Sequence, residues 1–446
     1  MKRYLIRAGF DPYTKKKIDP DDYMWQSYVG GNSGNLMFAY GVMNVMQTES
    51  TELEFTYKWS FSDKEIEEIN AKFDAFIIPM ADAFRVRWQK QLSALTDAIE
   101  KMKIPVIIIG IAVRADYEPD FSNGFEFDNC AKRFVNAVRK KGTVIGVRGE
   151  ITGDYLKHLG FKEEIDFTPI GCPSLYTYGS ATKTRSISGK VNTICVNTNG
   201  YYNVGNINEF LINTIDAFPE ISLVQQQQAE YRDLYLKKSW LPLLINNKIN
   251  KLDKTIINGN RLEVLFKKNK VRYFFDVISW INFMRDFDLF VGNRFHGTVA
   301  AVLAGVPHVM VPFNARTREL TEYHQLTCLK PDEIKEGTSV LDYIDRLDFQ
   351  SFDKHQEENL MHYIRFLEEN GLDNIFRKQK AFRFGESVLE QRIQKRIGIP
   401  LEDYCRTVND FESLDWWEKL LRIAMVHVKA LRINNIKSIA KKMGED

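Results

Sequence analysis

The chain has 446 residues, of which 44% are hydrophobic and 27% are charged, so we expect a globular protein of two or three domains. Its net charge of +2 argues against bulk binding to nucleic acid. Five cysteines without a CxxC pair or metal-ligand spacing argue against a disulfide framework and fit a reducing compartment. We find no signal peptide and no run of about 18 apolar residues, and therefore expect a cytoplasmic protein.

The first part of the chain alternates between short apolar runs and amphipathic stretches of helical length. The apolar runs predict strands at residues 4–6, 73–79, 105–110 and 144–147. Helical patterns follow the same order, at residues 36–46, 63–72, 88–101, 129–140 and 152–160. This alternation predicts a parallel, doubly wound α/β domain, which we place at residues 1–177.

A glycine-rich loop, Gly30-Gly-Asn-Ser-Gly-Asn35, precedes the first of these helices. Such a loop lets the backbone approach a ligand closely, so Asn32, Gly34 and Asn35 are candidate ligand-binding residues. The alternative interpretation is a flexible turn in which an asparagine caps the helix.

Polar residues also follow two of the predicted strands in this domain. Asp82 comes after the strand at 73–79, and Arg148 and Glu150 come after the strand at 144–147. Open parallel sheets bind ligands outside the carboxyl ends of their strands, so these residues are candidates for a substrate site.

The second part repeats the alternation after a polar linker at residues 178–190. We expect strands at residues 191–196, 221–225, 289–291 and 308–311, and helices at residues 208–218, 277–285 and 298–304. These elements predict a second doubly wound domain at residues 191–331, in which the polar stretch 226–276 is an inserted helical or lid region. Residues 332–446 are predicted to be mainly helical, with a charged amphipathic helix at 353–370.

A cationic amphipathic helix is predicted near the end of the chain, between Trp416 and Lys442. One interpretation is a helix that packs across the first domain and exposes a basic face to solvent. The other is peripheral contact with an anionic membrane surface that carries a lipid-linked acceptor.

The most informative stretch is residues 288–312, which is predicted to form a strand, a turn, a helix and a second strand. Its turn holds Asn293, Arg294 and His296, at the carboxyl end of the first strand. Gly305 is placed to cap the helix at its end, and Pro307 prevents the helix from continuing.

This turn combines three features that favour an anionic ligand. The start of a helix offers free N–H groups and a positive dipole end, and an arginine adds a planar fork for phosphate or carboxylate. The dipole disfavours a protonated histidine, whereas a bound anion favours it, so His296 could act as an acid or a base. The alternative is that Arg294 and His296 only cap and solvate the turn.

Taken together, the motifs of residues 1–330 resemble those of the polysaccharide pyruvyl transferases. The most specific is Arg294-Phe-His296, which is followed by the small helix, Gly305-Val-Pro307 and two basic residues. The other motifs are Gly31-Asn-Ser-Gly34, Phe76-Ile-Ile-Pro79, Val106-Ile-Ile-Ile-Gly-Ile-Ala-Val113, Val147-Arg-Gly-Glu150 and Gly171-Cys-Pro-Ser174.

The resemblance implies an α/β fold like that of B-type glycosyltransferases, with two Rossmann-like doubly wound domains that face each other across a cleft. Here a helical C-terminal extension would follow. Members of the family transfer the pyruvyl group of phosphoenolpyruvate onto two sugar hydroxyls as a ketal, in the synthesis of cell-surface glycans or exopolysaccharide. The implied partners are phosphoenolpyruvate and a sugar or lipid-linked oligosaccharide, in the cytoplasm or at the inner face of the membrane. No cofactor and no metal are implied.

The resemblance also implies roles for individual residues. His296 and Arg294 would be catalytic, and the first domain would hold the acceptor while the second holds the donor. The donor would contact Arg294, Asn293 and the basic residues of the loop after the last strand, Arg316 and Arg318. The acceptor side would be formed by Asn32, Gly34, Asn35, Asp82, Arg148 and Glu150.

The chain departs from the family pattern at three places. Asn35 stands where the family often has an acid, Met80-Ala-Asp-Ala stands where the family often has a glycine triplet, and Asn197-Thr-Asn199 lacks the family's arginine.

Two other function classes remain as alternatives. One is a B-type glycosyltransferase that uses a nucleotide sugar, although residues 288–312 lack the glutamate that such a site would favour. The other is a non-catalytic binding protein.

Overall fold

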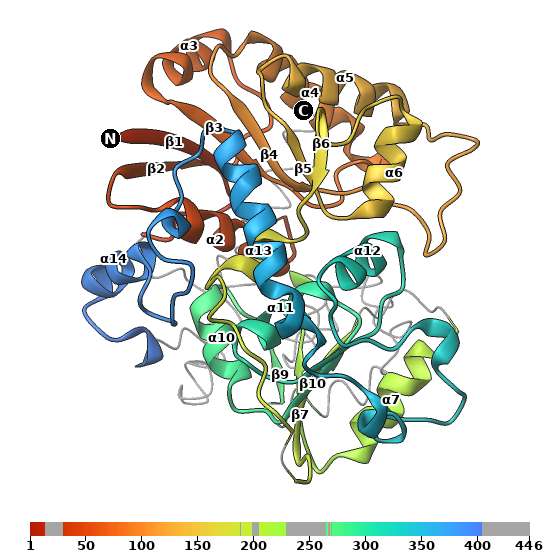
Figure 1. Cartoon of the computed structure of the whole chain (residues 1–446). Coiled ribbons are helices and arrows are strands. Elements are labelled where there is room, and N and C mark those ends of the chain that lie inside the picture. The colour runs from red at the N-terminus through yellow and green to blue at the C-terminus, as the bar shows by residue number, and fades with distance from the viewer. Residues whose placement is uncertain are drawn as a thin grey trace, which may run out of the picture.

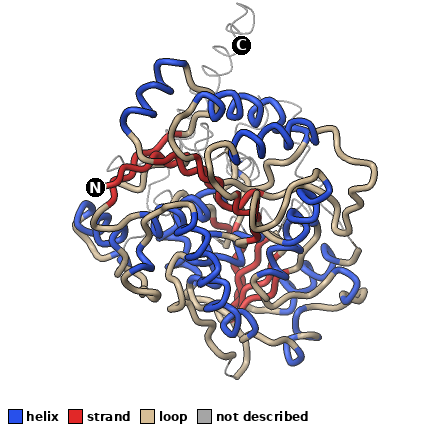
Figure 2. Tube along the Cα trace, turned by 45° about the horizontal axis from the view of Figure 1, so that its top comes forward, coloured by secondary structure: helices blue, strands red, loops and turns tan. Residues whose placement is uncertain are grey.

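The computed structural model describes residues 1–13, 30–187, 189–198, 205–228, 265, 268 and 270–403. In Figure 1 these residues form an upper and a lower part, each built on a parallel β-sheet. Figure 2 shows the strands inside and the helices around them. The two Rossmann-like α/β domains expected from the sequence are therefore confirmed.

The first domain contains a parallel sheet of six described strands, in the order β2-β1-β3-β4-β5-β6. The strands are β1 (Lys2–Arg7), β2 (Thr51–Thr56), β3 (Ala75–Pro79), β4 (Val106–Ile111), β5 (Ile145–Val147) and β6 (Phe167–Pro169). The connecting helices are α2 (Gly34–Met46), α3 (Asp63–Lys72), α4 (Gln89–Lys101), α5 (Asp128–Arg139) and α6 (Glu150–His158). Short 3₁₀ turns are η1 (Val86–Trp88) and η2 (Pro173–Tyr176).

β2 is absent from the strands that the sequence analysis predicts. It is an edge strand, and two of its side chains, Glu52 and Glu54, lie 3.3 and 3.1 Å from the guanidinium of Arg3 on β1. Charged residues protect an exposed sheet edge but remove the apolar run by which a strand is recognised.

The second domain contains a parallel sheet of five described strands, in the order β11-β10-β7-β8-β9. The strands are β7 (Thr193–Asn197), β8 (Glu220–Val224), β9 (Val271–Arg272), β10 (Leu289–Gly292) and β11 (His308–Met310). Its helices are α7 (Ile207–Ala217), α10 (Val277–Met284), α11 (Phe295–Leu303) and α12 (Ala315–Tyr323). β9 lies inside the stretch 226–276 that we interpreted as an insertion, and residues 229–264 of that stretch lie outside the described part of the chain.

The predicted loop after the last strand is wrong, because Arg316 and Arg318 lie in the first turn of α12. Asn314 caps this helix, with its side-chain oxygen accepting a hydrogen bond from the Thr317 amide at 3.0 Å. The hydroxyl oxygen of Thr317 accepts a hydrogen bond from the Asn314 backbone N–H at 3.1 Å, which completes a capping box.

Each sheet has a switch point, where the direction of winding reverses. In the first sheet this point lies between β1 and β3, and in the second between β7 and β10. Ligands bind outside the carboxyl ends of the strands at such points. The second switch point carries the turn with Arg294 and His296, and the first carries the loop with Asp82.

The two domains share one hydrophobic core. Side chains from one face of the first sheet, including Ile77 and Ile109, join a continuous buried cluster with α2, α10, α11 and the second sheet. A second cluster fills the other face of the first sheet, under α3, α4 and α5. The helix α2 contacts both α10 and α11 and lies at the junction of the two parts (Figure 1).

The C-terminal extension, described to residue 403, is built from helices and 3₁₀ turns joined by loops, and it links the domains again. Its long helix α13 (Ser351–Glu369) runs from the lower part to the upper part in Figure 1. Asp353 at its start accepts a hydrogen bond from the Thr184 amide at 2.9 Å, and Asn370 at its end accepts one from the Val144 amide at 3.0 Å. The remaining elements are η4 (Pro331–Glu333), η5 (Val340–Asp342), η6 (Ile344–Arg346), η7 (Ile375–Arg377), α14 (Val388–Ile397) and η8 (Leu401–Asp403).

A buried carboxyl group attaches α14 to α2. Glu390 accepts hydrogen bonds from the hydroxyls of Tyr40 on α2 and Tyr178, both at 2.9 Å. The residues between Trp416 and Lys442, for which we predict a cationic helix, lie outside the described residues. Within the described part, no helix is long and apolar enough to cross a membrane.

Candidate active site

The glycine-rich loop of the first domain joins the carboxyl edge of the second sheet. The Ser33 amide donates to the Gln226 carbonyl at 3.0 Å, and the Gln228 amide donates to the Gly31 carbonyl at 2.9 Å. Asn32 thereby forms an isolated antiparallel bridge with Gln227. The side chain of Asn32 accepts a bond from the Gly34 amide at 2.9 Å, which shapes the start of α2.

His296 lies directly against this loop. A Cβ atom added at Gly34 would stand 2.5 Å from His296 Nδ1, closer than such atoms approach in folded proteins. Glycine is therefore required here by a close approach between the domains. The structure brings two separately predicted candidates, Gly34 and His296, into contact.

The imidazole of His296 is buried, with 4% of the residue exposed. Its ring centroid lies 5.8 Å from that of Phe38 on α2, and its Nε2 atom has no hydrogen-bond partner among the described residues. Burial lowers the pKa of His296 well below its usual value, and the charges of Arg148 and Arg316 lower it further. The imidazole is therefore neutral, and its Nε2 atom has no partner among the described residues.

Arg294 is the N-cap residue of α11, which begins three residues earlier than predicted. Its Nε donates to the Thr198 carbonyl at 2.8 Å, beyond the end of β7. The Asn293 amide donates to the Asn197 carbonyl at 3.1 Å. These bonds join the ends of β7 and β10 at the switch point and fix the direction in which the turn presents Arg294 and His296.

Arg148 is fully buried and joins strand β4 to two loops of the first domain. It donates to the carbonyls of Gly110 and Met80 at 2.7 and 2.8 Å, and Nη1 lies 3.1 Å from Cys172 Sγ. The positive charge of Arg148 lowers the pKa of His296, whereas its guanidinium N–H groups are hydrogen-bonded to these protein atoms. The structure thus places Arg148 behind the site as a positioning group.

Among the described side chains, three arginines lie around the carboxylate of Asp82. Its Oδ2 lies 3.2 Å from Arg85 Nη1 and 3.2 Å from Arg114 Nη1, and its Oδ1 lies 3.9 Å from Arg316 Nη1. Burial alone would raise the pKa of Asp82, but Arg316, Arg85 and Arg114 together hold it below its usual value. Arg316 belongs to α12, so this cluster spans the two domains.

Arg318 lies in the same helical turn as Arg316 but contacts other residues. Its guanidinium donates to Glu118 at 2.5 Å and to Glu322 at 2.9 Å, and it also reaches the Tyr117 carbonyl. These bonds hold α12 against a loop of the first domain. Of the two basic candidates after the last strand, Arg316 is the one whose charge reaches His296.

The other predicted acceptor residues are placed as follows. Asn35 lies in the first turn of α2, with its amide donating to the Asn32 carbonyl at 3.0 Å. Glu150 lies at the start of α6, where partial desolvation of its carboxyl and the charge of Glu163 raise its pKa. The structure groups Glu150 with Glu163 and not with the His296 turn.

Glu319 on α12 is a buried carboxyl that the sequence analysis missed. Its two oxygens accept bonds from the amide and the hydroxyl of Thr152 on α6, both at 2.9 Å. Burial raises the pKa of Glu319 to about 8, against the opposing effects of Thr152, Arg148 and Arg316. This contact holds the helix of Arg316 on the first domain, and a glutamate in a stretch predicted to be a loop gave no signal of it.

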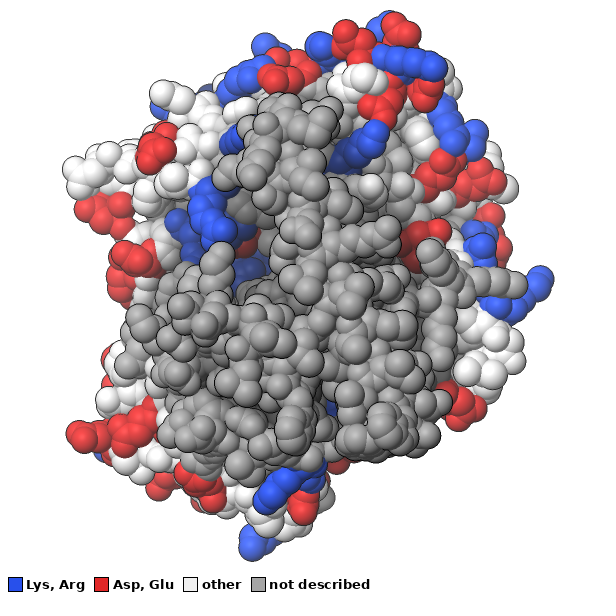
Figure 3. Space-filling model, turned by 180° about the vertical axis from the view of Figure 1, so that it is seen from behind, with Lys and Arg blue, Asp and Glu red and all other residues white. Residues whose placement is uncertain are grey.

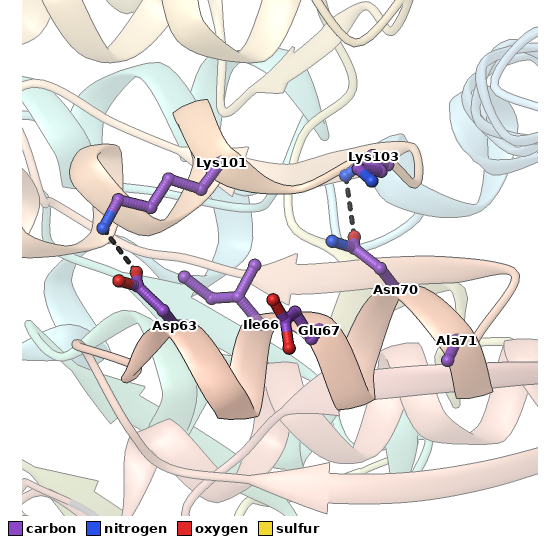
Figure 4. Close-up of a pocket in the computed structure, with 7 residues that line it drawn as sticks. All are labelled: Asp63, Ile66, Glu67, Asn70, Ala71, Lys101 and Lys103. Atoms are coloured by element: carbon purple, nitrogen blue, oxygen red, sulfur yellow. Dashed lines mark hydrogen bonds and ion pairs between the residues drawn. The ribbon is translucent and has the colours of Figure 1, made fainter.

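The cavity drawn in Figure 4 has a volume of about 590 Å³ and lies beside α3. A Lys101–Asp63 ion pair of 2.6 Å and a bond of 2.7 Å from the Lys103 amide to Asn70 span it. None of the predicted site residues lines it, so we do not assign it a role. No group of three or more potential metal ligands occurs within the described residues.

The fold is that of a two-domain α/β protein with a parallel sheet and a switch point in each domain. The chain belongs to the polysaccharide pyruvyl transferase family, whose profile matches residues 13–314. That range includes Gly34, Asp82 and the His296 turn. No curated protein matches the chain significantly.

Solved structures show distant likeness only. An uncharacterised protein of Klebsiella pneumoniae is 14% identical, with 73% of this chain and 88% of that chain covered and a TM-score of 0.37. The UDP-GlcNAc 2-epimerase of Methanocaldococcus jannaschii is 13% identical, with 82% and 99% covered and a TM-score of 0.38. The glycosyltransferase SnogD of Streptomyces nogalater is 10% identical, with 89% and 99% covered and a TM-score of 0.30. These likenesses carry no weight for substrate or reaction.

The contact between Gly34 and His296 is testable by a double-mutant cycle. Gly34→Ala should lower the free energy of unfolding by about 1–3 kcal/mol, because the new methyl group overpacks the imidazole. In the His296→Ala background the same substitution should cost much less, because only the contact with Gln226 Oε1, at 3.0 Å, remains. Urea unfolding of the four proteins measures both effects, and an equal cost in both backgrounds would contradict the contact.

The pKa of Glu319 predicts a pH-dependent stability. Because the folded-state value of about 8 lies above the unfolded value near 4.5, this contribution is full below the unfolded pKa and is lost as pH rises through the folded one. Glu319→Gln should remove the loss, so the variant should gain on the wild type by on the order of 3–5 kcal/mol between about pH 5 and 9. Thermal unfolding across that range measures it.

The matched control is Glu322→Gln, which changes an exposed carboxylate one turn further along α12. It should leave the pH profile of the wild type unchanged. Parallel profiles for the wild type and Glu319→Gln would show that Glu319 is ionised in the folded protein throughout, against our assignment.

Proposed function

We propose that the site at His296 binds phosphoenolpyruvate and transfers its pyruvyl group to two hydroxyls of a glycan. The observation that supports this most is a buried, neutral imidazole under the influence of two guanidinium groups, at the junction of two switch points. Such a site is poorly suited to a cation. A trianionic donor would meet Arg294 and Arg316, and helix α11 would present free N–H groups to it.

The donor would change the protonation of His296. Burial and the two arginines, Arg148 and Arg316, oppose a positive charge on the ring. A bound phosphate and carboxylate would offset those arginines and favour the imidazolium, which raises the pKa of His296. The unpartnered Nε2 would then be the proton donor for the methylene carbon of phosphoenolpyruvate.

The transfer follows from that proton. Protonation of the methylene carbon leaves an oxocarbenium-like centre at the neighbouring carbon, which one sugar hydroxyl attacks as it loses its proton. The bond to the phosphate oxygen breaks, and the second hydroxyl closes the ketal. Arg294 and Arg316 would stabilise the departing phosphate, and Arg148 would keep the surrounding loops in place.

The acceptor would be held by the first domain, where Asn32, Asn35 and Asp82 lie near the joined edges. We propose that it is a sugar or lipid-linked oligosaccharide of capsule or exopolysaccharide synthesis, met at the inner face of the membrane. A cytoplasmic location is supported by the four cysteines in the described residues, all of which are free thiols.

Donor binding is the first test. Titration calorimetry should show that wild-type protein binds phosphoenolpyruvate and takes up protons near pH 8, because His296 becomes charged in the complex. Arg294→Gln should weaken binding by on the order of 2 kcal/mol, about thirtyfold. His296→Gln should still bind the donor but without this proton uptake, which is measured by repeating the titration in buffers of different ionisation enthalpy.

A panel of nucleotide sugars provides the opposing outcome. If a nucleotide sugar binds and phosphoenolpyruvate does not, the site is that of a glycosyltransferase. Proton uptake that is the same in His296→Gln would remove His296 from the proposed role even if the donor is correct.

A further inference from the structure

An arginine without a counter-ion lies at the end of the first strand of the first sheet. Arg7 is the last residue of β1, at the carboxyl edge of the sheet and beside its switch point. Its guanidinium stacks on the indole of Trp59, with Cζ 3.3 Å from the ring centroid. We propose that Arg7 and the aromatic side chains beside it bind an acidic sugar of the acceptor glycan through the carboxylate of that sugar. The inference rests on the proposed function and names a class of acceptor for it.

The first argument is the charge of Arg7. Its Nε donates to the Lys58 carbonyl at 3.1 Å and its Nη2 to the Tyr57 carbonyl at 3.4 Å. These partners are neutral, and Arg7 forms no ion pair with a carboxylate of the described residues. Burial lowers the pKa of Arg7 to about 9, and no acidic group opposes this effect. A half-buried guanidinium that lacks a counter-ion favours binding of an added anion.

Arg3, on the same strand, has the opposite surroundings. Its guanidinium lies 3.3 Å from Glu52 and 3.1 Å from Glu54 on β2. The register of β1 with β2 places Arg7 opposite Thr56, which carries no charge. Figure 3 shows basic side chains next to acidic ones around much of the rim of the rear face, so local charge balance is common on this molecule. Arg7 departs from that balance at the edge of the sheet where ligands bind.

The second argument is the aromatic surface beside this cation. The rings of Trp59 and Trp88 lie nearly perpendicular to each other, with centroids 4.7 Å apart. Both residues are half-buried, and Tyr57 is 75% exposed. Trp88 follows β3, so the ends of two neighbouring strands contribute to this surface. The C–H groups on the face of a sugar ring pack on aromatic rings, and its carboxylate could then reach the guanidinium.

The third argument is the number of available charges. Lys58 is paired with Glu65, and Arg85, which precedes the turn of Trp88, is paired with Asp82. One guanidinium without a counter-ion matches the single negative charge of a carboxylate. A phosphate dianion would favour a second cation.

The position of this surface indicates which part of the glycan it would bind. It belongs to the first domain, which we propose holds the acceptor. Among the described residues, His296 packs against Gly34 and Phe38 of α2 and makes no ring contact with Trp59 or Trp88. The acidic sugar would therefore be a neighbour, within the glycan, of the sugar that receives the pyruvyl group.

The test uses glucuronate and glucose as probes, which differ in the carboxylate. Each is titrated into the full chain at low ionic strength, and binding is followed by ligand-observed NMR. Wild-type protein should bind glucuronate more tightly than glucose. Arg7→Gln should weaken glucuronate about tenfold and leave glucose unchanged, as expected for loss of one charge-assisted contact.

Two further variants separate charge from stacking. Tyr57→Ala should weaken glucuronate and glucose by the same factor, about threefold, because it removes aromatic surface without changing the charge. Arg3→Gln is the matched control, because Arg3 lies on the same strand but is already paired with two glutamates. It should change the affinity for glucuronate less than about twofold.

Thermal unfolding of each variant accompanies the titrations, so that a loss of binding is counted only for a folded protein. Tyr57 is exposed, so Tyr57→Ala keeps the test decisive should Arg7→Gln fail to fold. The inference is overturned if wild type does not bind glucuronate, or if either variant binds it as tightly as wild type does. Tighter binding of inorganic phosphate than of glucuronate, lost in Arg7→Gln, would also overturn the assignment to a carboxylate.

Phosphoenolpyruvate is titrated into the same proteins to separate this inference from the proposed function. Arg294→Gln should weaken phosphoenolpyruvate and leave glucuronate unchanged, whereas Arg7→Gln should do the reverse. Failure of phosphoenolpyruvate alone to bind would overturn the proposed function and leave the acidic-sugar site standing.

Discussion

The contact between Gly34 and His296 is the constraint on which the rest of the site depends. It requires a residue without a side chain at the start of α2 and an imidazole in the first turn of α11. These helices begin at the carboxyl edges of different sheets, so the contact brings the two switch points together. The shared hydrophobic core around α2, and the C-terminal helix α13 that spans both domains, hold the edges in that relation.

Charge then determines what the junction can do. Buried Arg148 and half-buried Arg316 both disfavour a proton on His296, and burial adds to the effect. In the function that we propose, an anionic donor would reverse the balance, so that donor binding and protonation of His296 would be coupled. The buried carboxyl of Glu319 affects the site through packing. It accepts a hydrogen bond from Thr152 on α6, which holds α12 and therefore Arg316 in position. A single helix, α12, thus links domain packing to the electrostatics of the site.

Local patterns predicted much of the fold. Apolar runs located β3, β4, β7 and β10, and the position of Arg294 and His296 after β10 identified the turn at a switch point. The helix α12 was predicted to be a loop. Its start is marked by a capping box, but its few apolar residues do not form a helical pattern. The edge strand β2 was not predicted, because its charged side chains leave no apolar run from which a strand could be recognised.

The interactions between domains could not be predicted from local patterns. Glu319 and Thr152 are 167 residues apart, and nothing in either segment indicates the other. Arg85 and Arg114 stand after predicted strands, so their position was a usable signal, but their convergence on Asp82 depends on the order of β3 and β4 in the sheet. Buried polar partners of this kind are set by topology, which a single sequence does not display.

The most direct measurement of the central claim is a crystal structure of the protein with phosphoenolpyruvate bound. The account predicts that the donor lies at the junction of the two sheets, with its anionic groups on Arg294 and Arg316 and its methylene carbon facing His296 Nε2. Phosphoenolpyruvate bound away from the His296 turn, or bound there with the methylene carbon turned from the imidazole, would contradict it.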